Sequence, residues 1–249
     1  MKIKAIKTKK ITPGKESLRQ ILDRYLPKKM AERSILAITS KIVAICEGSV
    51  VPVDKIEKAD LIEQEAELYL PPEENKYNIT LTIRDNVLLP TAGIDESNAG
   101  GYYILWPAEP QKTANKVRSY LKKRYQLKEV GVIITDSKTT PLRRGTTGVA
   151  VCHSGFSGLN NYIGAPDIFG KKMRVTKQNV MDALAVSAVL VMGEGREQTP
   201  VAIISDLPFV QFLRGNPSKR DLTALHISID DDLYAPMLKG VKWKKGKRK

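Results

Sequence analysis

The chain has 249 residues, of which 42% are hydrophobic and 27% are charged. This composition supplies enough apolar material for one large domain or two modest ones. The only two cysteines, Cys46 and Cys152, form no CxxC pair, which argues against a disulfide scaffold or a cysteine-ligated zinc site. The longest apolar helical stretch, residues 183–192, has about half the length of a membrane-spanning helix. We therefore expect a soluble, cytoplasmic protein with no membrane partner.

The charge is strongly positive and unevenly distributed. Lys and Arg total 41 against 27 Asp and Glu, a formal excess of 14, which favours anionic partners such as nucleotides. Residues 239–249 carry seven basic side chains and no acidic one, which is half of this excess. We interpret residues 239–249 as a solvated basic C-terminal tail. Residues 1–238 are expected to form a single folded unit, which could consist of two interlocked lobes. Nucleic acid is not an expected partner.

The first part of the chain alternates between strand and helix patterns. Residues 1–6 alternate weakly, as in a strand, and Ser17 is placed to cap a helix with one apolar face. Residues 35–46 are apolar except for a Thr-Ser-Lys triplet, which indicates two short buried segments or one interrupted strand. The spacing predicts a helix within 55–70, closed by two prolines.

The middle of the chain continues this alternation. Residues 79–89 alternate like a strand, and 102–106 form another strand candidate. Residues 113–125 have the spacing of a basic amphipathic helix. Residues 130–135 are a nearly continuous β-branched run, as expected of a strand that is buried on both faces.

The last part contains one long helix and two further strands. Residues 149–152 and 201–205 have strand patterns, and Thr176 can cap a helix that reaches Met192. The segment 208–220 is rich in proline and charge, which predicts a mobile loop. The whole pattern predicts mixed strands and helices.

Three acidic clusters lie at the ends of apolar runs, around Asp95, Asp136 and Glu194. A carboxylate that ends a buried strand or helix lies at the rim of the core, where it can bind a hard divalent cation. Ser137 adds a hydroxyl beside Asp136. Phosphoryl transfer from a nucleoside triphosphate needs such cations to bridge the phosphate oxygens. The sequence therefore predicts a metal-assisted phosphate site, although each carboxylate alone is a weak indication.

The common nucleotide-binding motifs are absent from the sequence. It contains no GxxxxGK[ST] phosphate loop. A GxGxxG fingerprint starting at Gly193 and Gly195 fails because Gln198 takes the place of the third glycine. Common nucleotide-binding folds are thus disfavoured.

Five short segments occur in an order that resembles the coenzyme F420-0:L-glutamate ligase family. They are Gly-Ile-Asp-Glu-Ser-Asn at 93–98, Gly-Val-Ile-Ile-Thr-Asp-Ser at 131–137, Arg-Arg-Gly at 143–145, Asp-Ile-Phe-Gly at 167–170 and Met-Gly-Glu-Gly at 192–195. The resemblance runs from about residue 35 to 205. It implies an α+β fold of mixed sheets with helices, in two interlocked lobes, that assembles as a homodimer with the site in a cleft.

The resemblance also implies an activity. The family joins the amine of L-glutamate to a carboxylate of the deazaflavin precursor F420-0, with GTP, Mg²⁺ or Mn²⁺, and a monovalent ion such as K⁺. Activation of the acceptor carboxylate as an acyl phosphate is the implied mechanism. The expected partners are therefore GTP, L-glutamate and F420-0, or a folate-type acceptor.

Site residues follow from the resemblance position by position. Asp95 and Asp136 would hold one divalent ion and take part in catalysis, while Ser137 and Glu194 would contribute to a second ion. The implied nucleotide-binding residues are Ser40, Lys41, Asn98, Met192 and Gly193. Arg143 and Arg144 are further catalytic candidates, because guanidinium groups suit carboxylates and phosphates. Either arginine also suits an exposed loop.

Three positions depart from the family's pattern. Ile45 stands where lysine is common, Thr139-Thr140 replaces Gly-Arg, and Cys152 replaces a glycine. Two alternatives therefore stay open beside F420-0 ligation. The first is the same ligase chemistry on a folate-type acceptor, and the second is a non-catalytic nucleotide- or RNA-binding protein, which the net charge favours. His153 is expected to be a satisfied loop residue rather than a catalytic base.

Overall fold

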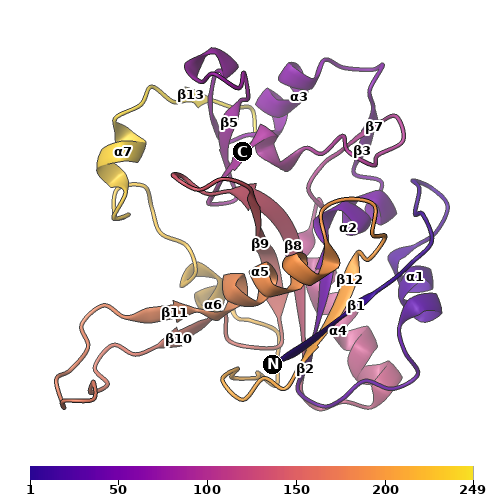
Figure 1. Cartoon of the computed structure of the whole chain (residues 1–249), viewed down its shortest axis with the longest axis vertical. Helices are drawn as coiled ribbons and strands as arrows, with labels where there is room; N and C mark the ends of the chain where they lie inside the picture. The colour runs from indigo at the N-terminus through magenta and orange to yellow at the C-terminus, as the bar shows by residue number, and fades with distance from the viewer. Residues whose placement is uncertain (249) are drawn as a thin grey trace.

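A five-stranded mixed sheet forms the centre of the molecule (Figure 1), as described by a computed structural model of residues 1–248. Its strand order is β1 (Lys2–Ile6), β12 (Val201–Ser205), β2 (Ser34–Thr39), β8 (Val130–Thr139) and β9 (Thr146–Ser154). The pair β2 and β8 is parallel, and the other three pairs are antiparallel. The parallel pair therefore lies inside the sheet, and its strand β8 contains Asp136.

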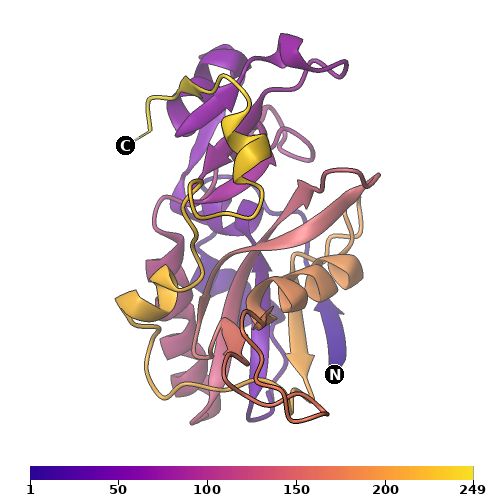
Figure 2. The same cartoon turned by 90° about the vertical axis from the view of Figure 1, so that its left-hand side faces the viewer.

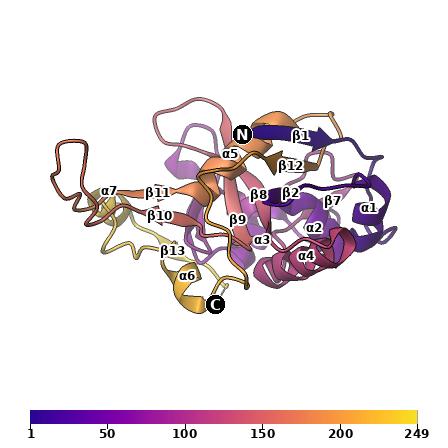
Figure 3. The ribbon, with the colours of Figure 1, turned by 90° about the horizontal axis from the view of Figure 1, so that it is seen from below.

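Helices cover both faces of this sheet (Figure 3). The helix α5 (Val180–Met192) lies on one side, and α1 (Leu18–Tyr25) and α4 (Pro110–Tyr125) lie on the other. Alternate residues of β8 enter different cores: Ile133 packs with α5 residues, and Ile134 shares a cluster with residues of α1 and α4. Full burial of such a side chain contributes about 1.5–3 kcal/mol. The prediction of a strand buried on both faces is confirmed.

A second, four-stranded sheet lies at one end of the molecule (Figure 2). Its order is β13 (Lys244–Lys245), β4 (Leu68–Leu70), β5 (Leu81–Arg84) and β6 (Val87–Pro90). Figure 2 shows this sheet above the five-stranded one, with the yellow C-terminal segment beside it. The α+β fold with mixed sheets is confirmed, and the interlocking of two lobes stays a prediction.

The remaining elements are short. They are α2 (Ser40–Glu47), β3 (Val50–Pro52), α3 (Lys58–Glu65), the 3₁₀ turns η1 (Pro72–Glu74) and η2 (Thr91–Gly93), β7 (Tyr102–Ile104), β10 (Leu159–Asn161), β11 (Lys177–Asn179), α6 (Lys219–Thr223) and α7 (Ala235–Lys239). β3 pairs with β7, and β10 pairs with β11 to form the base of a projecting arm (Figures 1 and 3). Among residues 1–248, no helix is both long and apolar enough to cross a bilayer.

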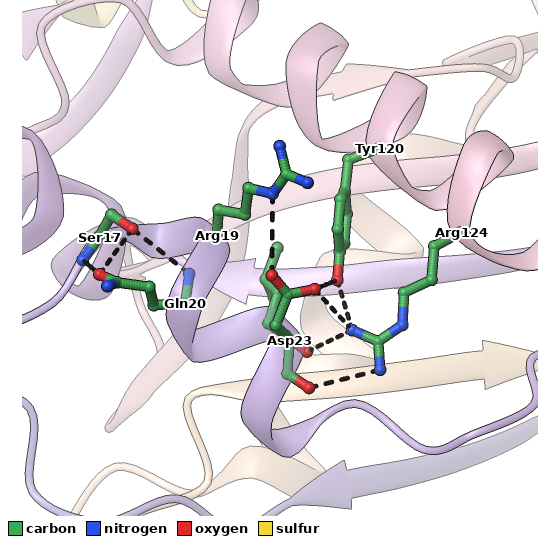
Figure 4. A network of polar contacts seen from close by, with 7 residues as sticks. Ser17, Arg19, Gln20, Asp23, Tyr120 and Arg124 are labelled. Atoms are coloured by element: carbon green, nitrogen blue, oxygen red, sulfur yellow. Dashed lines mark hydrogen bonds and ion pairs between the residues drawn. The ribbon is translucent and has the colours of Figure 1, made fainter.

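Polar contacts fix the start of α1 and join this helix to α4 (Figure 4). Ser17 and Gln20 form a capping box, in which each side chain serves the other residue's backbone N–H. Asp23 accepts a 2.6 Å hydrogen bond from the Tyr120 hydroxyl and a 3.2 Å contact from Arg124. The predicted helix after Ser17 is confirmed, together with its cap.

Two elements differ from the sequence-based expectation. The segment 79–89 is a hairpin rather than one strand, because Asp85 and Asn86 have φ values of 47° and 62° and reverse the chain between β5 and β6. Thr176 does not cap α5. Asn179 does so, with its side chain accepting a 3.0 Å hydrogen bond from the Asp182 N–H, because residues 177–179 extend as β11 first.

The basic C-terminal segment is not a free solvated end. Lys244 and Lys245 pair with β4 as strand β13. Beyond them, the Gly246 N–H donates to Glu67 O at 2.9 Å, and the Lys247 N–H donates to Glu63 O at 2.8 Å. The expectation of a solvated tail considered only charge. It missed that β4 has an edge whose backbone groups can accept another strand.

Candidate functional site

The parallel pair β2 and β8 brings two predicted segments to one edge of the central sheet. Thr39 lies opposite Thr135 in the register of these strands. Parallel strands present their carboxyl ends at the same edge. Ser40 and Lys41, which begin α2, therefore emerge beside Asp136 and Ser137. This geometry explains why residues almost 100 positions apart meet.

A β-bulge lies immediately before Asp136. The pairing of β8 with β9 shifts between Ile134 and Thr135, so that Val151 is the extra residue on the partner strand. Bulges bend the strand locally and change where the next side chains point, and they are frequent beside active sites. After the bulge, Asp136 and Ser137 are only partly buried, whereas the preceding residues of β8 are fully buried. The carboxylate is thus delivered to the rim of the core.

Asp95 reaches the same edge from the loop after η2. Its backbone forms an isolated bridge with Ile104, with N–O distances of 2.9 and 2.8 Å. Its side chain accepts hydrogen bonds from the N–H (2.7 Å) and hydroxyl (2.8 Å) of Ser97. Lys41 Nζ lies 2.5 Å from the other carboxylate oxygen, Oδ2. The loop therefore presents an ion-paired carboxylate next to the start of α2.

Glu194 arrives from the end of α5. The helix ends at Gly193, whose φ is 82° and where a Cβ would lie 2.6 Å from a Glu197 side-chain atom, so glycine is required there. The Ser137 hydroxyl donates a 2.7 Å hydrogen bond to Glu194 Oε1. Asn98 Nδ2 donates to Gly195 O at 3.2 Å. These two bonds tie the α5 end to β8 and to the Asp95 loop.

All three segments line one cavity of about 520 Å³. The predicted metal and nucleotide residues that line it are Ser40, Lys41, Asp95, Asn98, Asp136, Ser137, Met192, Gly193 and Glu194. The cavity is concave and carries convergent charged groups, as a site for a phosphorylated ligand requires. Folding thus gathers every predicted ligand except the two arginines.

The two aspartates in this cavity have opposite electrostatic environments. For Asp95, burial alone would raise the pKa, but the Lys41 ammonium and the Ser97 donors outweigh burial and lower it. For Asp136, burial raises the pKa to about 6, although hydrogen bonds from the Ser137 N–H, Trp106 and Ser40 act against it. The negative charge of Asp95 raises the Asp136 pKa further. The carboxylates are therefore close enough to interact.

The donor set is suited to a hard cation. Asp95, Asp136, Ser137 and Glu194 offer only oxygen atoms, which Mg²⁺ and Mn²⁺ prefer. Within residues 1–248, no three His, Cys, Asp or Glu side chains converge closely enough to enclose an ion by themselves. Magnesium typically uses one or two carboxylates and completes its shell with waters and substrate phosphates. The residues fit an ion of this kind, which a phosphate would share.

Comparison with known proteins identifies the family. The F420-0:Gamma-glutamyl ligase profile matches residues 5–206, which is most of the chain. The chain belongs to this family. The resemblance stated from the sequence is confirmed, and with it the expectation of a ligase.

Several members of the F420-0:γ-glutamyl ligase family are similar over most of their length. A protein of Methanopyrus kandleri described as coenzyme F420:L-glutamate ligase is 32% identical over 215 residues, covering 80% of this chain and 84% of the relative. Proteins with the same description are 31% identical in Methanococcus maripaludis, covering 80% and 84%, and 32% identical in Methanocaldococcus jannaschii, covering 76% and 80%. The profile match, residues 5–206, includes all the segments that form the cavity.

Arg143 and Arg144 are the predicted site residues that the described chain does not bring to the cavity. They lie in the exposed turn that joins β8 to β9 (Figure 1), next to Leu142, whose side chain is 97% exposed. Within residues 1–248, the guanidinium of Arg143 forms one hydrogen bond, to the neighbouring Leu142 carbonyl at 3.3 Å. Their catalytic role in this ligase-family chain stays a prediction.

Four residues that sequence reasoning missed also belong to the site. Lys9, Lys10 and Arg196 line the cavity, and Trp106 donates a hydrogen bond from its indole N–H to Asp136 Oδ2. The lysines arrive because the chain leaving β1 stays beside the segment before β12, where the Thr8 N–H donates to Gln198 O at 2.8 Å. A pair of lysines after a weak strand gives no sequence pattern that would have found them.

His153 also differs from its expectation. It lies within β9 rather than in a loop, and it is 1% exposed. Neither ring nitrogen has a hydrogen-bond partner in the described chain, and burial lowers its pKa to about 4. The expectation of a satisfied loop residue is therefore wrong in both respects. His153 does not line the cavity, and its lack of a role as a base stays a prediction.

Proposed function

We propose that this protein is a GTP- and divalent-metal-dependent γ-glutamyl ligase that adds L-glutamate to the terminal carboxylate of coenzyme F420-0. The observation that carries the proposal is the convergence of Asp95, Asp136 and Glu194, from three separate elements, on one cavity that also contains Lys41. The descriptions of the relatives as coenzyme F420:L-glutamate ligases supply the substrates.

The reaction has two steps. An oxygen of the acceptor carboxylate attacks the γ-phosphorus of GTP. The bond between this phosphorus and the β-phosphate oxygen breaks, so that an acyl phosphate forms and GDP is released. The glutamate amine then attacks the acyl carbon, loses a proton, and expels inorganic phosphate to leave an amide. One divalent cation held by Asp95 and Asp136, and a second to which Ser137 and Glu194 contribute, would neutralise the phosphate charge.

The protein residues orient the charged substrates. Lys41 has a flexible side chain, so its ammonium group can leave the Asp95 carboxylate and bind a phosphate oxygen instead. Lysine commonly binds phosphate in this way. The 3.2 Å hydrogen bond from Asn98 to the Gly195 carbonyl joins two segments that line the cavity. Lys9, Lys10 and Arg196 also line the cavity and add positive charge. This charge attracts a triphosphate and holds it near the carboxylates.

A homodimer is part of the proposal. The arm that contains β10 and β11 exposes large apolar side chains, including Ile168 at 92% and Phe169 at 88%. Contiguous exposed apolar surface is typical of an interaction site. Association of two copies would also provide a route for Arg143 and Arg144 to approach a cavity.

A folate-type acceptor is the second candidate, and one position favours it. Ile45, which replaces a lysine of the family pattern, lines the cavity, so the departure is located where a substrate binds. Cys152, in contrast, is a buried residue of β9 and does not line the cavity. Ile45 is therefore the departure that changes the chemistry of the cavity wall, where a different acceptor would be selected.

The test is an assay with both acceptors. Purified protein is incubated with GTP, Mn²⁺, K⁺, L-glutamate and either F420-0 or a folate, and the products are measured by mass spectrometry. F420-0 should gain one glutamyl residue with release of one GDP for each amide formed, and omission of glutamate should prevent product formation. Product with the folate alone would favour the second candidate. Salt-dependent RNA binding with no GTP turnover would contradict both.

A further inference from the structure

Trp106 holds one oxygen of Asp136. The residue follows β7 and is 2% exposed, and its indole N–H donates to Asp136 Oδ2. The other oxygen, Oδ1, accepts the Ser137 N–H at 2.8 Å. The approach of the indole depends on Gly93, where a Cβ would lie 2.2 Å from Trp106 Nε1. Both carboxylate oxygens of Asp136 therefore have fixed donors.

A buried arginine lies over the face of the indole. Arg84 is 1% exposed, and its guanidinium carbon is 5.3 Å from the Trp106 ring centroid. Its Nη1 contacts Glu65 Oε2 at 2.8 Å and the Ala92 carbonyl at 3.2 Å. A cation over an aromatic face is attractive, more so when both are removed from water. Arg84 therefore restricts the position of the ring.

The C-terminal segment that follows β13 completes the charge balance around Arg84. Arg248 Nη2 lies 3.0 Å from Asp85 Oδ2, and its Nη1 lies 3.7 Å from Glu65 Oε2. Two arginines thus balance the two carboxylates of Glu65 and Asp85. A Cβ at Gly246 would lie 1.9 Å from the Ala66 carbonyl oxygen. The close approach of the C-terminal segment to Ala66 therefore requires glycine at this position. Without Arg248, the cluster would keep two acids and one buried base.

We propose that Trp106 is a positioning residue for Asp136, and that the docked C-terminal segment stabilises this position through Arg248, the two carboxylates and Arg84. This inference rests on the role proposed for Asp136 in the ligase. The family profile ends at residue 206, so the segment that contributes Arg248 lies outside the matched part. Hydrogen-bond partners of metal ligands typically change metal affinity by 10- to 100-fold when they are removed.

The first test observes the indole directly. The chain has two tryptophans, Trp106 and Trp243, so Trp243→Phe leaves a single indole N–H signal in a ¹H–¹⁵N spectrum. In that background, Asp136→Asn should shift the Trp106 signal upfield. The single amide oxygen serves the Ser137 N–H, and the amide NH₂ in place of Oδ2 cannot accept a hydrogen bond from the indole. Arg248→Met should shift or broaden the same signal. Lys247→Met, which removes one charge from the same C-terminal segment at an exposed side chain, should leave it unchanged.

The second test measures metal binding. Trp106→Phe keeps an aromatic ring and removes the donor, and it should weaken Mn²⁺ binding about tenfold; Arg248→Met should weaken it less, and Lys247→Met not at all. If Trp106→Phe does not fold, the spectra of the Asp136 and Arg248 variants still test the positioning role of Trp106 and its link to Arg248. An unmoved indole signal in Asp136→Asn would overturn the positioning role, and identical spectra for the Arg248 and Lys247 variants would overturn the link to the tail. These results require no turnover, so they are separable from failure of the ligase assay.

Discussion

Lys41 Nζ lies 2.5 Å from Asp95 Oδ2, so the first turn of α2 and the loop after η2 are joined by an ion pair inside the cavity. The same ammonium group lies 3.0 Å from the Ser97 carbonyl oxygen. It therefore already occupies an anionic site formed by the protein. A phosphate that enters the cavity competes with Asp95 for this cation, and a metal ion competes with Lys41 for the carboxylate.

Replacement of Lys41 should therefore separate nucleotide binding from folding. We expect Lys41→Ala to weaken GTP binding about 10- to 100-fold, the loss that follows from a charge-assisted hydrogen bond of about 1.5–3 kcal/mol. The measurement is calorimetric titration with GTP. Lys58→Ala is the matched control, because Lys58 forms an ion pair with the neighbouring Glu96 at 3.1 Å and does not line the cavity. Equal GTP affinity in wild type and Lys41→Ala would remove Lys41 from the nucleotide site.

Asp136→Asn should abolish turnover and preserve the fold. The amide is nearly isosteric and keeps an oxygen for the Ser137 N–H, but it removes the negative charge that a cation requires. We expect ligase activity to fall at least 100-fold. Thermal stability should change little, because removal of an unfavourably buried charge offsets the loss of the Trp106 hydrogen bond. Asp206→Asn, an exposed carboxylate paired with Lys2, is the control. A folded Asp136→Asn variant with normal turnover would show that this carboxylate is not a ligand.

The pKa of Asp136 predicts a specific pH dependence. Its folded-state pKa of about 6 lies above its usual value, so the folded state binds more protons than the unfolded state between about pH 4 and 6. The contribution of Asp136 to stability should therefore decrease as the pH rises through this window, by up to about 3 kcal/mol, and stay constant above it. Chemical denaturation at several pH values measures this change, and Asp136→Asn should lose it.

Metal binding should follow the opposite trend, because only the ionised carboxylate is a good ligand. Mn²⁺ affinity should fall by up to tenfold per pH unit below about pH 6 and level off above it. Titrations monitored by electron paramagnetic resonance between pH 5 and 8 would test this. An affinity that is constant from pH 5 to 7 would show that Asp136 is not the group that titrates.

The position of Arg143 and Arg144 leads to a prediction about the dimer. If these arginines act on the partner's cavity, a mixture of Asp136→Asn subunits with Arg143→Ala/Arg144→Ala subunits should regain activity. Half of the dimers would be mixed, and each would have one intact site, which gives about one quarter of the wild-type activity. Each variant alone should be inactive. A mixture that stays inactive after proven subunit exchange would exclude action across the dimer.

Much of this fold was accessible from local patterns. The β-branched run 130–135 predicted a strand buried on both faces, and the Ser17 cap predicted α1, because burial and capping leave marks in adjacent residues. The hairpin at Asp85 and Asn86 was missed, because its turn contains no glycine that would have indicated a chain reversal. The docked C-terminal strand was missed because charge suggests solvent, whereas the partner edge on β4 is distant in the sequence.

The candidate site shows the same division. Asp95, Asp136 and Glu194 were found because they end apolar runs and match the family's segments, and the cavity unites them. Trp106, Lys9 and Lys10 were not found, because each enters the site only through tertiary packing. The Trp106 N–H reaches the carboxylate of Asp136, 30 positions away, because Gly93 in a third segment leaves space for the indole ring. No local spacing encodes such an arrangement.

A crystal structure with Mn²⁺ and GTP tests the central claim most directly. The account predicts anomalous scattering from Mn²⁺ at about 2.1–2.3 Å from oxygens of Asp95, Asp136 or Glu194, bridged to the triphosphate, with Lys41 moved from Asp95 to a phosphate oxygen. Mn²⁺ and GTP bound elsewhere on the molecule, with this cavity empty and the Lys41–Asp95 pair intact, would contradict it.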